Sequence, residues 1–193
     1  MGFLGALFGR DGKVTWRRPL VIPDPVIGFL NLMGAEGTVL AEADSRALSP
    51  LFRSSLDSTY QAPRCDVLFL YCRVDQAGQL QGCDSTLPEL ITEAGALVIV
   101  VASGSDIDSL MSTVSGKGGW TGNLVLTTDR RGPKFIPFFA RLFRRMFEGG
   151  SMLTAWTELA PQVPGRDDPE VPSTVMISRG PGHIAFGRRS VGA

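Results

Sequence analysis

Two short apolar runs constrain the fold of this chain more than any other feature of its sequence. Residues 65–75 and 96–106 each contain a continuous stretch of β-branched and large apolar side chains, and each run ends abruptly in polar residues. Continuous apolar runs of this length, without alternation, are typical of strands buried on both faces of a sheet. A sheet is covered on both faces when helices connect parallel strands. We therefore expect two neighbouring parallel strands whose polar ends share one edge of a sheet.

Bulk properties indicate one ordinary globular domain. The chain has 193 residues, 44% hydrophobic and 20% charged, and a formal net charge of zero. A chain of this length predicts a single domain over 1–193, which we expect to be of the α/β class. We also expect a mobile or loosely docked segment at 1–12. The prolines of 161–172 indicate a surface loop there. The zero charge argues against bulk electrostatic capture of nucleic acid.

The cysteines give no disulfide framework and no zinc site. There are three of them, Cys65, Cys72 and Cys83, an odd number without a CxxC pair. We expect Cys65 and Cys72 to be buried thiols, and we expect no bound metal, no cofactor and a reducing cytoplasmic location. The apolar residues 2–9 allow two interpretations, a loosely docked terminus or a short foot on a membrane surface or a partner, so the protein could also be peripheral to a membrane.

The remaining segments alternate between strand and helix signals. The expected elements are extended chain at 19–25, strands at 38–41, 66–72, 97–102 and 123–128, helices from Ser49, from Ser85 or Thr86 to Gly95, and over 105–114, 134–147 and 152–160, and a late hairpin of strands 173–178 and 183–186. This order predicts an α/β fold with three layers and a mostly parallel sheet with helices on both faces.

The helix at 134–147 has the clearest pattern. Its apolar residues recur at spacings of three and four: Phe135, Phe138, Phe139, Leu142, Phe143 and Met146. We expect Phe139, Phe143 and Met146 to be innermost on the sheet, and the flanking members to pack on helix 152–160 through Leu153 and Trp156.

The pair of apolar runs, followed by the helical segment 138–156 with its Gly149-Gly150-Ser151 junction, resembles a caspase-like peptidase domain of the CHAT type, over roughly residues 38–187. This resemblance implies a caspase-like fold and a role in a bacterial signalling or conflict system. It also implies that one strand ends in a catalytic His and the next in a catalytic Cys. Here Arg73 stands at the His position, and Ala102 or Ser103 at the Cys position. A cysteine peptidase needs a thiolate and an adjacent base, so the resemblance implies a member without catalytic residues.

Polar residues that follow the predicted strands form the candidate ligand site. They are Arg73, Asp75, Ser103, Gly104, Ser105, Asp106, Thr128, Asp129 and Arg130. The segment 103–106 leads into a helix N-terminus, so it is either a simple cap or part of a pocket for a small anionic ligand. No Walker lysine or GxGxxG accompanies it.

A second candidate surface is basic. It comprises Arg131, Lys134, Arg141, Arg144 and Arg145, on or just before helix 134–147. This face is either simply solvated or binds an acidic protein partner or a phospholipid. No aromatic platform is interleaved with these residues, so we expect no nucleic acid.

Three functions stay open. The favoured one is a non-catalytic domain that binds or regulates a protein partner. The alternatives are an active hydrolase that uses Cys72 or Ser103, and a peripheral membrane or assembly component that uses residues 2–9. A Cys72–His183 dyad is a weaker form of the hydrolase alternative, since His183 lies in a sequence typical of a tight turn.

Overall fold

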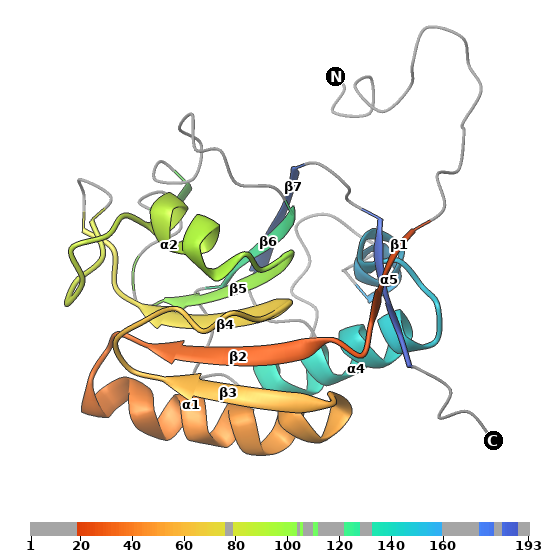
Figure 1. Ribbon diagram of the computed structural model, residues 1–193, viewed down its shortest axis with the longest axis horizontal. Helices are drawn as coiled ribbons and strands as arrows, with labels where there is room; N and C mark the ends of the chain where they lie inside the picture. The colour runs from red at the N-terminus through yellow and green to blue at the C-terminus, as the bar shows by residue number, and fades with distance from the viewer. Residues whose placement is uncertain are drawn as a thin grey trace, which may run out of the picture.

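A computed structural model gives the arrangement of the chain (Figure 1). It describes residues 19–75, 79–103, 105, 110–111, 122–127, 133–159, 174–179 and 183–188. The expected segments 1–12 and 161–172, and most of the helix expected at 105–114, lie outside the described residues.

The described strands form a mostly parallel six-stranded sheet in the order β3-β2-β4-β5-β6-β7. Its strands are β2 (Val26–Asn31), β3 (Ser54–Ser58), β4 (Val67–Cys72), β5 (Val98–Ser103), β6 (Gly122–Thr127) and β7 (Thr174–Arg179). All neighbouring pairs are parallel except β6 with β7. The predicted pairing of the two apolar runs is confirmed, because β4 and β5 are adjacent, parallel and buried along their whole length.

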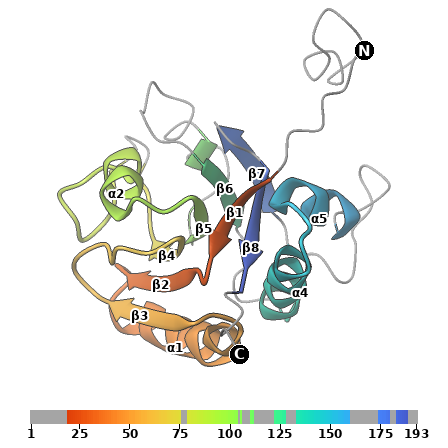
Figure 2. The same cartoon turned by 45° about the vertical axis from the view of Figure 1, so that its right-hand side comes forward.

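Helices cover both faces of this sheet, as predicted. On one face lie α1 (Ala35–Leu48), α4 (Phe135–Phe147) and α5 (Met152–Leu159), and on the other lies α2 (Leu87–Ala94) (Figures 1 and 2). Side chains alternate between the faces, so that Phe69 and Tyr71 of β4 pack on the side of α4 and α1, whereas Leu70 and Cys72 pack on the side of α2.

Local sequence signals explain the boundaries of α2 and α5. Thr86 forms a capping box with Glu89, Pro88 stands in the first turn, and Gly95 ends α2 in the left-handed conformation with φ 66°. Ser151 accepts a hydrogen bond from the Thr154 N–H at 3.2 Å, as expected of the residue before α5. These two helices are confirmed close to their predicted bounds.

The N-terminal third differs from the sequence prediction. Residues 38–41, expected as a strand, belong to α1, and Ser49 opens only a 3₁₀ turn, Ser49–Leu51, ahead of β3. The residues that α1 buries are Gly37, Ala41, Asp44 and Leu48. They follow a helical period, but two are very small and one is acidic, which hides that period in a hydrophobicity pattern. Strand β2 was not predicted at all.

The predicted hairpin of the last two strands is wrong. β7 pairs with β6, whereas β8 (Ile184–Gly187) leaves the main sheet and pairs in parallel with β1 (Leu20–Pro23). Aromatic packing explains this exchange, since Phe186 of β8 lies 5.8 Å from Phe52 and 5.1 Å from Phe147 between ring centroids. The late strand therefore extends the core that α4 forms instead of folding back on its neighbour.

Helix α4 has the buried face that its sequence predicts. All six of its apolar residues that recur at helical spacing are fully buried. Phe138 contacts Trp156 of α5 at 5.3 Å between ring centroids, in agreement with the predicted helix pair. Phe135 belongs to α4 and is also predicted to pack on α5, and its ring centroid lies 6.1 Å from that of Phe69 in the sheet.

Truncation of Phe143 should strongly destabilise the protein. Its ring contacts Phe52, Phe69 and Phe186, and it has no exposed surface. Phe143→Ala is expected to lower the free energy of unfolding by about 3–5 kcal/mol in urea titrations. Arg144→Ala, at an exposed neighbouring position, should change it by less than about 0.5 kcal/mol. Equally small effects from both substitutions would show that α4 does not pack on the sheet.

Candidate functional site

The strand order identifies one place where the direction of the connections reverses. The chain passes from β2 outward to β3, and then returns past β2 to β4, β5 and β6. In open parallel sheets, such a reversal leaves a crevice at the carboxyl ends of the two central strands, where ligands bind. In this protein that point lies between the ends of β2 and β4, at Asn31 and Cys72.

An ion pair spans this point. The Arg73 guanidinium, just after β4, donates a hydrogen bond of 2.5 Å to the carboxylate of Glu36 in the first turn of α1. Both side chains are partly exposed, so screening by water limits the stabilisation to below about 1 kcal/mol. A carboxylate in the first turn is also favoured by the helix dipole. Arg73 therefore links the end of β4 to the start of α1.

The buried side chain of Asn31 stabilises the connection between β2 and α1 through hydrogen bonds. It is only 6% exposed, and its amide nitrogen donates to the Gly34 carbonyl at 2.8 Å and to Thr38 Oγ1 at 3.1 Å. Its amide oxygen accepts the Met33 N–H at 2.9 Å. These bonds stabilise a turn at the N-terminus of α1 whose N-cap residue, Gly34, has no side chain to cap it.

Ser103 and Ser105 connect the ends of β4 and β5. Ser105 Oγ accepts the Val74 N–H at 2.8 Å and donates to the Val74 carbonyl at 2.9 Å, while its own N–H donates to Ser103 Oγ at 3.0 Å. Asp75 closes the adjoining turn, since its carboxylate accepts the Gln79 N–H at 2.9 Å. These three predicted site residues take part in backbone contacts at the sheet edge.

The structure places Arg73 and Ser103 toward opposite faces of the sheet. Arg73 follows Cys72 and reaches α1, whereas Ser103, which is paired with Cys72, lies toward the α2 side. Among the other predicted ligand residues, Gly104, Asp106, Thr128, Asp129 and Arg130 lie outside the described residues. The pocket expected between Arg73 and the segment after β5 is therefore not formed by the described members of the set.

The cysteine and histidine are not arranged for nucleophilic catalysis. Cys72 has no exposed surface, and burial raises the pKa of its thiol to about 12. His183 lies before β8, where its Nδ1 is 3.3 Å from Ser151 Oγ, on the side of the sheet opposite to Cys72. The Cys72–His183 dyad, the weaker form of the hydrolase alternative, is therefore not formed. Burial likewise raises the pKa of Cys65 to about 12.

The predicted basic face is partly engaged within the protein. Arg144 and Arg145 are exposed, and Lys134 and Arg141 are half-buried. Arg145 forms ion pairs with Glu148 at 3.4 Å and Glu158 at 4.0 Å. Arg131 lies outside the described residues. These contacts reduce the positive charge that the described part of this face could offer to an acidic partner.

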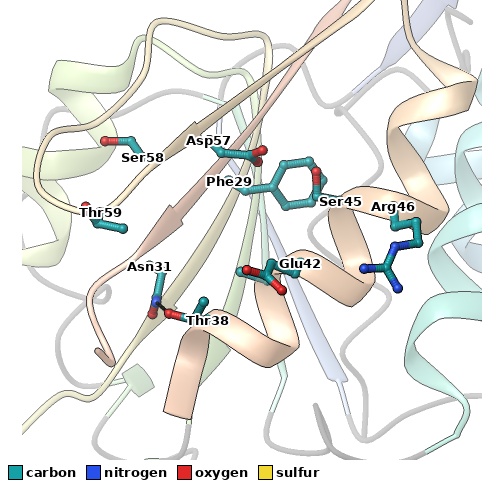
Figure 3. A pocket seen from close by; sticks show the side chains of 10 residues that line it. Phe29, Asn31, Thr38, Glu42, Ser45, Arg46, Asp57, Ser58 and Thr59 are labelled. Carbon is teal, nitrogen blue, oxygen red and sulfur yellow. Dashed lines mark hydrogen bonds between the residues drawn. The ribbon is translucent and has the colours of Figure 1, made fainter. Parts of the chain in front are cut away.

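A groove that the sequence did not predict, lined by both polar and apolar side chains, lies between α1 and the edge strand β3 (Figure 3). Its volume is about 490 Å³, within the range of roughly 300–1,000 Å³ that is typical of ligand sites. Its described lining residues are Phe29 and Asn31 of β2, Thr38, Ala41, Glu42, Ser45 and Arg46 of α1, and Asp57, Ser58 and Thr59 at β3. The groove thus begins beside the β2 end of the crevice and continues along the outer strand.

The shape of α1 explains this groove. The helix packs on β2 and β4, and its buried residues include Gly37, Ala41 and Leu48. It also buries Asp44, whose carboxylate accepts a hydrogen bond of 2.5 Å from the Tyr71 hydroxyl. Of the residues that α1 buries, only the small Ala41 lines the space between the helix and β3. The carboxylates of Glu42 and Asp57 face this space from its two walls (Figure 3).

Comparison with protein-family models, with curated proteins and with solved structures gave no match. Within the described parts of the chain, no group of three or more His, Cys, Asp or Glu side chains could hold a metal ion. No helix among the described residues is long and apolar enough to cross a membrane.

Substitution of Gly37 should disturb the wall of the groove. A Cβ at this position would lie 2.0 Å from Asn31 Oδ1 and 2.8 Å from Met33 Cβ. Gly-to-Ala changes inside helices are normally stabilising by about 0.5–1 kcal/mol. Here we expect Gly37→Ala to lower the free energy of unfolding by about 1–3 kcal/mol, because Asn31 must leave its hydrogen bonds.

A double-mutant cycle with Asn31→Ala separates this contact from a general effect on the helix. Asn31→Ala removes the two nearest side-chain atoms of Asn31 that a Cβ at position 37 would meet, although the contact with Met33 remains. The two substitutions together should therefore cost less than the sum of the single ones in urea unfolding. A Gly37→Ala protein that is more stable than the natural chain would contradict the close approach of Asn31.

Proposed function

We propose that this protein is a non-catalytic caspase-like domain of the CHAT type, which acts as a binding or regulatory module in a bacterial signalling or conflict system. The sheet supports the resemblance, because the two strands that would carry the catalytic His and Cys lie side by side as β4 and β5, with Cys72 paired to Ser103. The partner is proposed to be a protein that contacts the carboxyl edge of β2 and β3 and the adjoining groove.

The observation that carries this proposal is the chemistry at the ends of these two strands. Arg73 is engaged with Glu36, and Ser103 accepts a hydrogen bond from the backbone of Ser105. Cys72 is buried among the apolar residues on the α2 side. A thiol whose pKa is raised to about 12 stays protonated near neutral pH, and a protonated thiol is a poor nucleophile.

The hydrolase alternative receives no support from the described groups. A serine nucleophile needs a base within hydrogen-bond reach, and the hydroxyl of Ser103 faces the Ser105 backbone instead. The membrane or assembly alternative rests on residues 2–9, which lie outside the described residues. It stays a prediction that liposome flotation of the full chain and of a chain without residues 1–10 would test.

Thiol reactivity provides a direct check on the buried cysteines. At pH 8 in the native protein, Cys83, which is partly exposed, should react with 5,5′-dithiobis(2-nitrobenzoic acid) within minutes. Cys65 and Cys72 should react only after unfolding in guanidinium, because they are buried and protonated. Fast labelling of Cys72 in the folded protein would return the cysteine hydrolase to consideration.

The absence of turnover can be measured independently. Purified protein incubated with unfolded casein should release no peptides detectable by mass spectrometry. Cys72→Ala serves as the matched control, since any contaminating peptidase would act equally in both samples. Cleavage that disappears in Cys72→Ala would overturn the proposal of a non-catalytic domain.

A further inference from the structure

We propose that the free edge of β3 and the groove beside it bind an extended peptide in which basic and apolar side chains alternate. The peptide adds to β3 as a further strand of the sheet. This inference rests on the proposed function and names the chemical class of the partner. Addition of a strand to an open sheet edge is a common mode of peptide recognition, in which backbone hydrogen bonds give affinity and alternate side chains give specificity.

The first observation is the open edge itself. β3 pairs with β2 along one side, and no other strand among the described residues pairs with its other side. Four of its five residues, from Ser54 to Asp57, are exposed. Proteins commonly protect such edges with lysine, proline or a covering element. β3, with the sequence SSLDS, contains neither lysine nor proline.

The second observation is that the two faces of β3 differ in chemistry. Asp57 is paired with Phe29 and shares its face of the sheet, where the groove opens toward α1. Leu56 is paired with Gly28 on the opposite face and is 41% exposed, and Tyr60, just beyond the strand, is 92% exposed. A strand added beside β3 would therefore present alternate side chains to the groove that Asp57 lines and to the face of the sheet that carries Leu56.

The charged side chains that line the groove favour a basic peptide. Glu42 and Asp57 face the groove from opposite walls, and Arg46, one turn further along α1, also lines it, so the ionisable lining residues carry two negative charges and one positive charge (Figure 3). Lysine or arginine side chains of a bound strand could reach both carboxylates, and acidic side chains would be repelled there. A second copy of β3 is a poorer occupant, because pairing β3 with itself would bring a second Asp57 to the same acidic face.

Fluorescence anisotropy with synthetic peptides tests this proposal. The probe is a labelled peptide of about eight residues in which Lys alternates with Val, long enough to span a strand such as β3. Binding should weaken by about 3-fold in Asp57→Asn and in Glu42→Gln, and by about 10-fold in the double variant. Glu93→Gln, at an exposed carboxylate on α2, is the matched control and should bind like the natural chain.

Hydrogen bonding between the backbones of the peptide and β3 is tested by modifying the peptide instead of the protein. N-methylation of every second residue removes the N–H groups that face one side of an added strand. One of the two possible methylation patterns should reduce affinity by about 10-fold or more, while the other leaves it nearly unchanged. Hydrogen exchange of the complex should then show slowed amides in β3 and unchanged amides in α2.

Several results would overturn this inference while leaving intact the proposal that the domain is a non-catalytic binding module. They are equal binding of a peptide with Glu in place of Lys, equal binding of both N-methylated peptides, or protection located away from β3. Concentration-dependent dimers in sedimentation that Leu56→Lys abolishes would identify a second copy as the occupant instead. Recovery of a cleaved peptide would overturn the proposed function but not the docking site, so the two failures are distinguishable.

Discussion

The core is organised around the side chain of Phe69 at the centre of β4. Its ring lies 5.4 Å from Phe29 of β2 and 6.1, 5.4 and 6.0 Å from Phe135, Phe139 and Phe143 of α4, between centroids. Aromatic pairs of this kind contribute about 0.5–1.5 kcal/mol each beyond the burial of their area. The cluster fixes α4 on the sheet, and through Phe143 and Phe186 it also holds the β1–β8 ribbon. Helix α1 packs on the same core through Ala41 and Leu48 and is also held by the hydrogen bonds of Asp44 and Asn31, and the groove lies between this helix and β3.

The parts of the fold that the sequence predicted correctly are those with strong apolar periodicity. β4 and β5 have unbroken apolar runs, and α4 has six large apolar residues at helical spacing, so each pattern admits one interpretation. The failures have a common cause in weak patterns. α1 buries Gly37, Ala41 and Asp44, and β3 is an edge strand with one apolar residue, so neither resembles the usual helix or strand. The parallel pairing of β8 with β1 depends on contacts far apart in the chain, which local patterns do not reveal.

The sequence predicted where the candidate site residues lie, but not how they face one another. A parallel sheet implies that polar residues meet at its carboxyl edge, and Arg73, Asp75, Ser103 and Ser105 do occupy that edge. Which of them face each other depends on side-chain alternation and on the position of α1, neither of which follows from spacing alone. To predict the groove, one must know that β3 lies beside β2 in the sheet. This order could not be inferred, because neither strand was predicted from the sequence. A signal was present in retrospect: Asn31 and Gly37, flanking Gly34, mark a tight strand-to-helix turn.

The account depends most directly on the parallel pairing of β3 with β2, since both the groove and the open edge disappear without it. Nuclear Overhauser contacts between backbone protons in solution measure this pairing. The structure predicts parallel cross-strand contacts in the register Ile27 with Ser55 and Phe29 with Asp57. It also predicts no contacts of comparable strength from the outer side of β3 to another strand among the described residues. An antiparallel pattern, or the absence of contacts between residues 54–58 and 26–30, would contradict both the site and the function proposed for it.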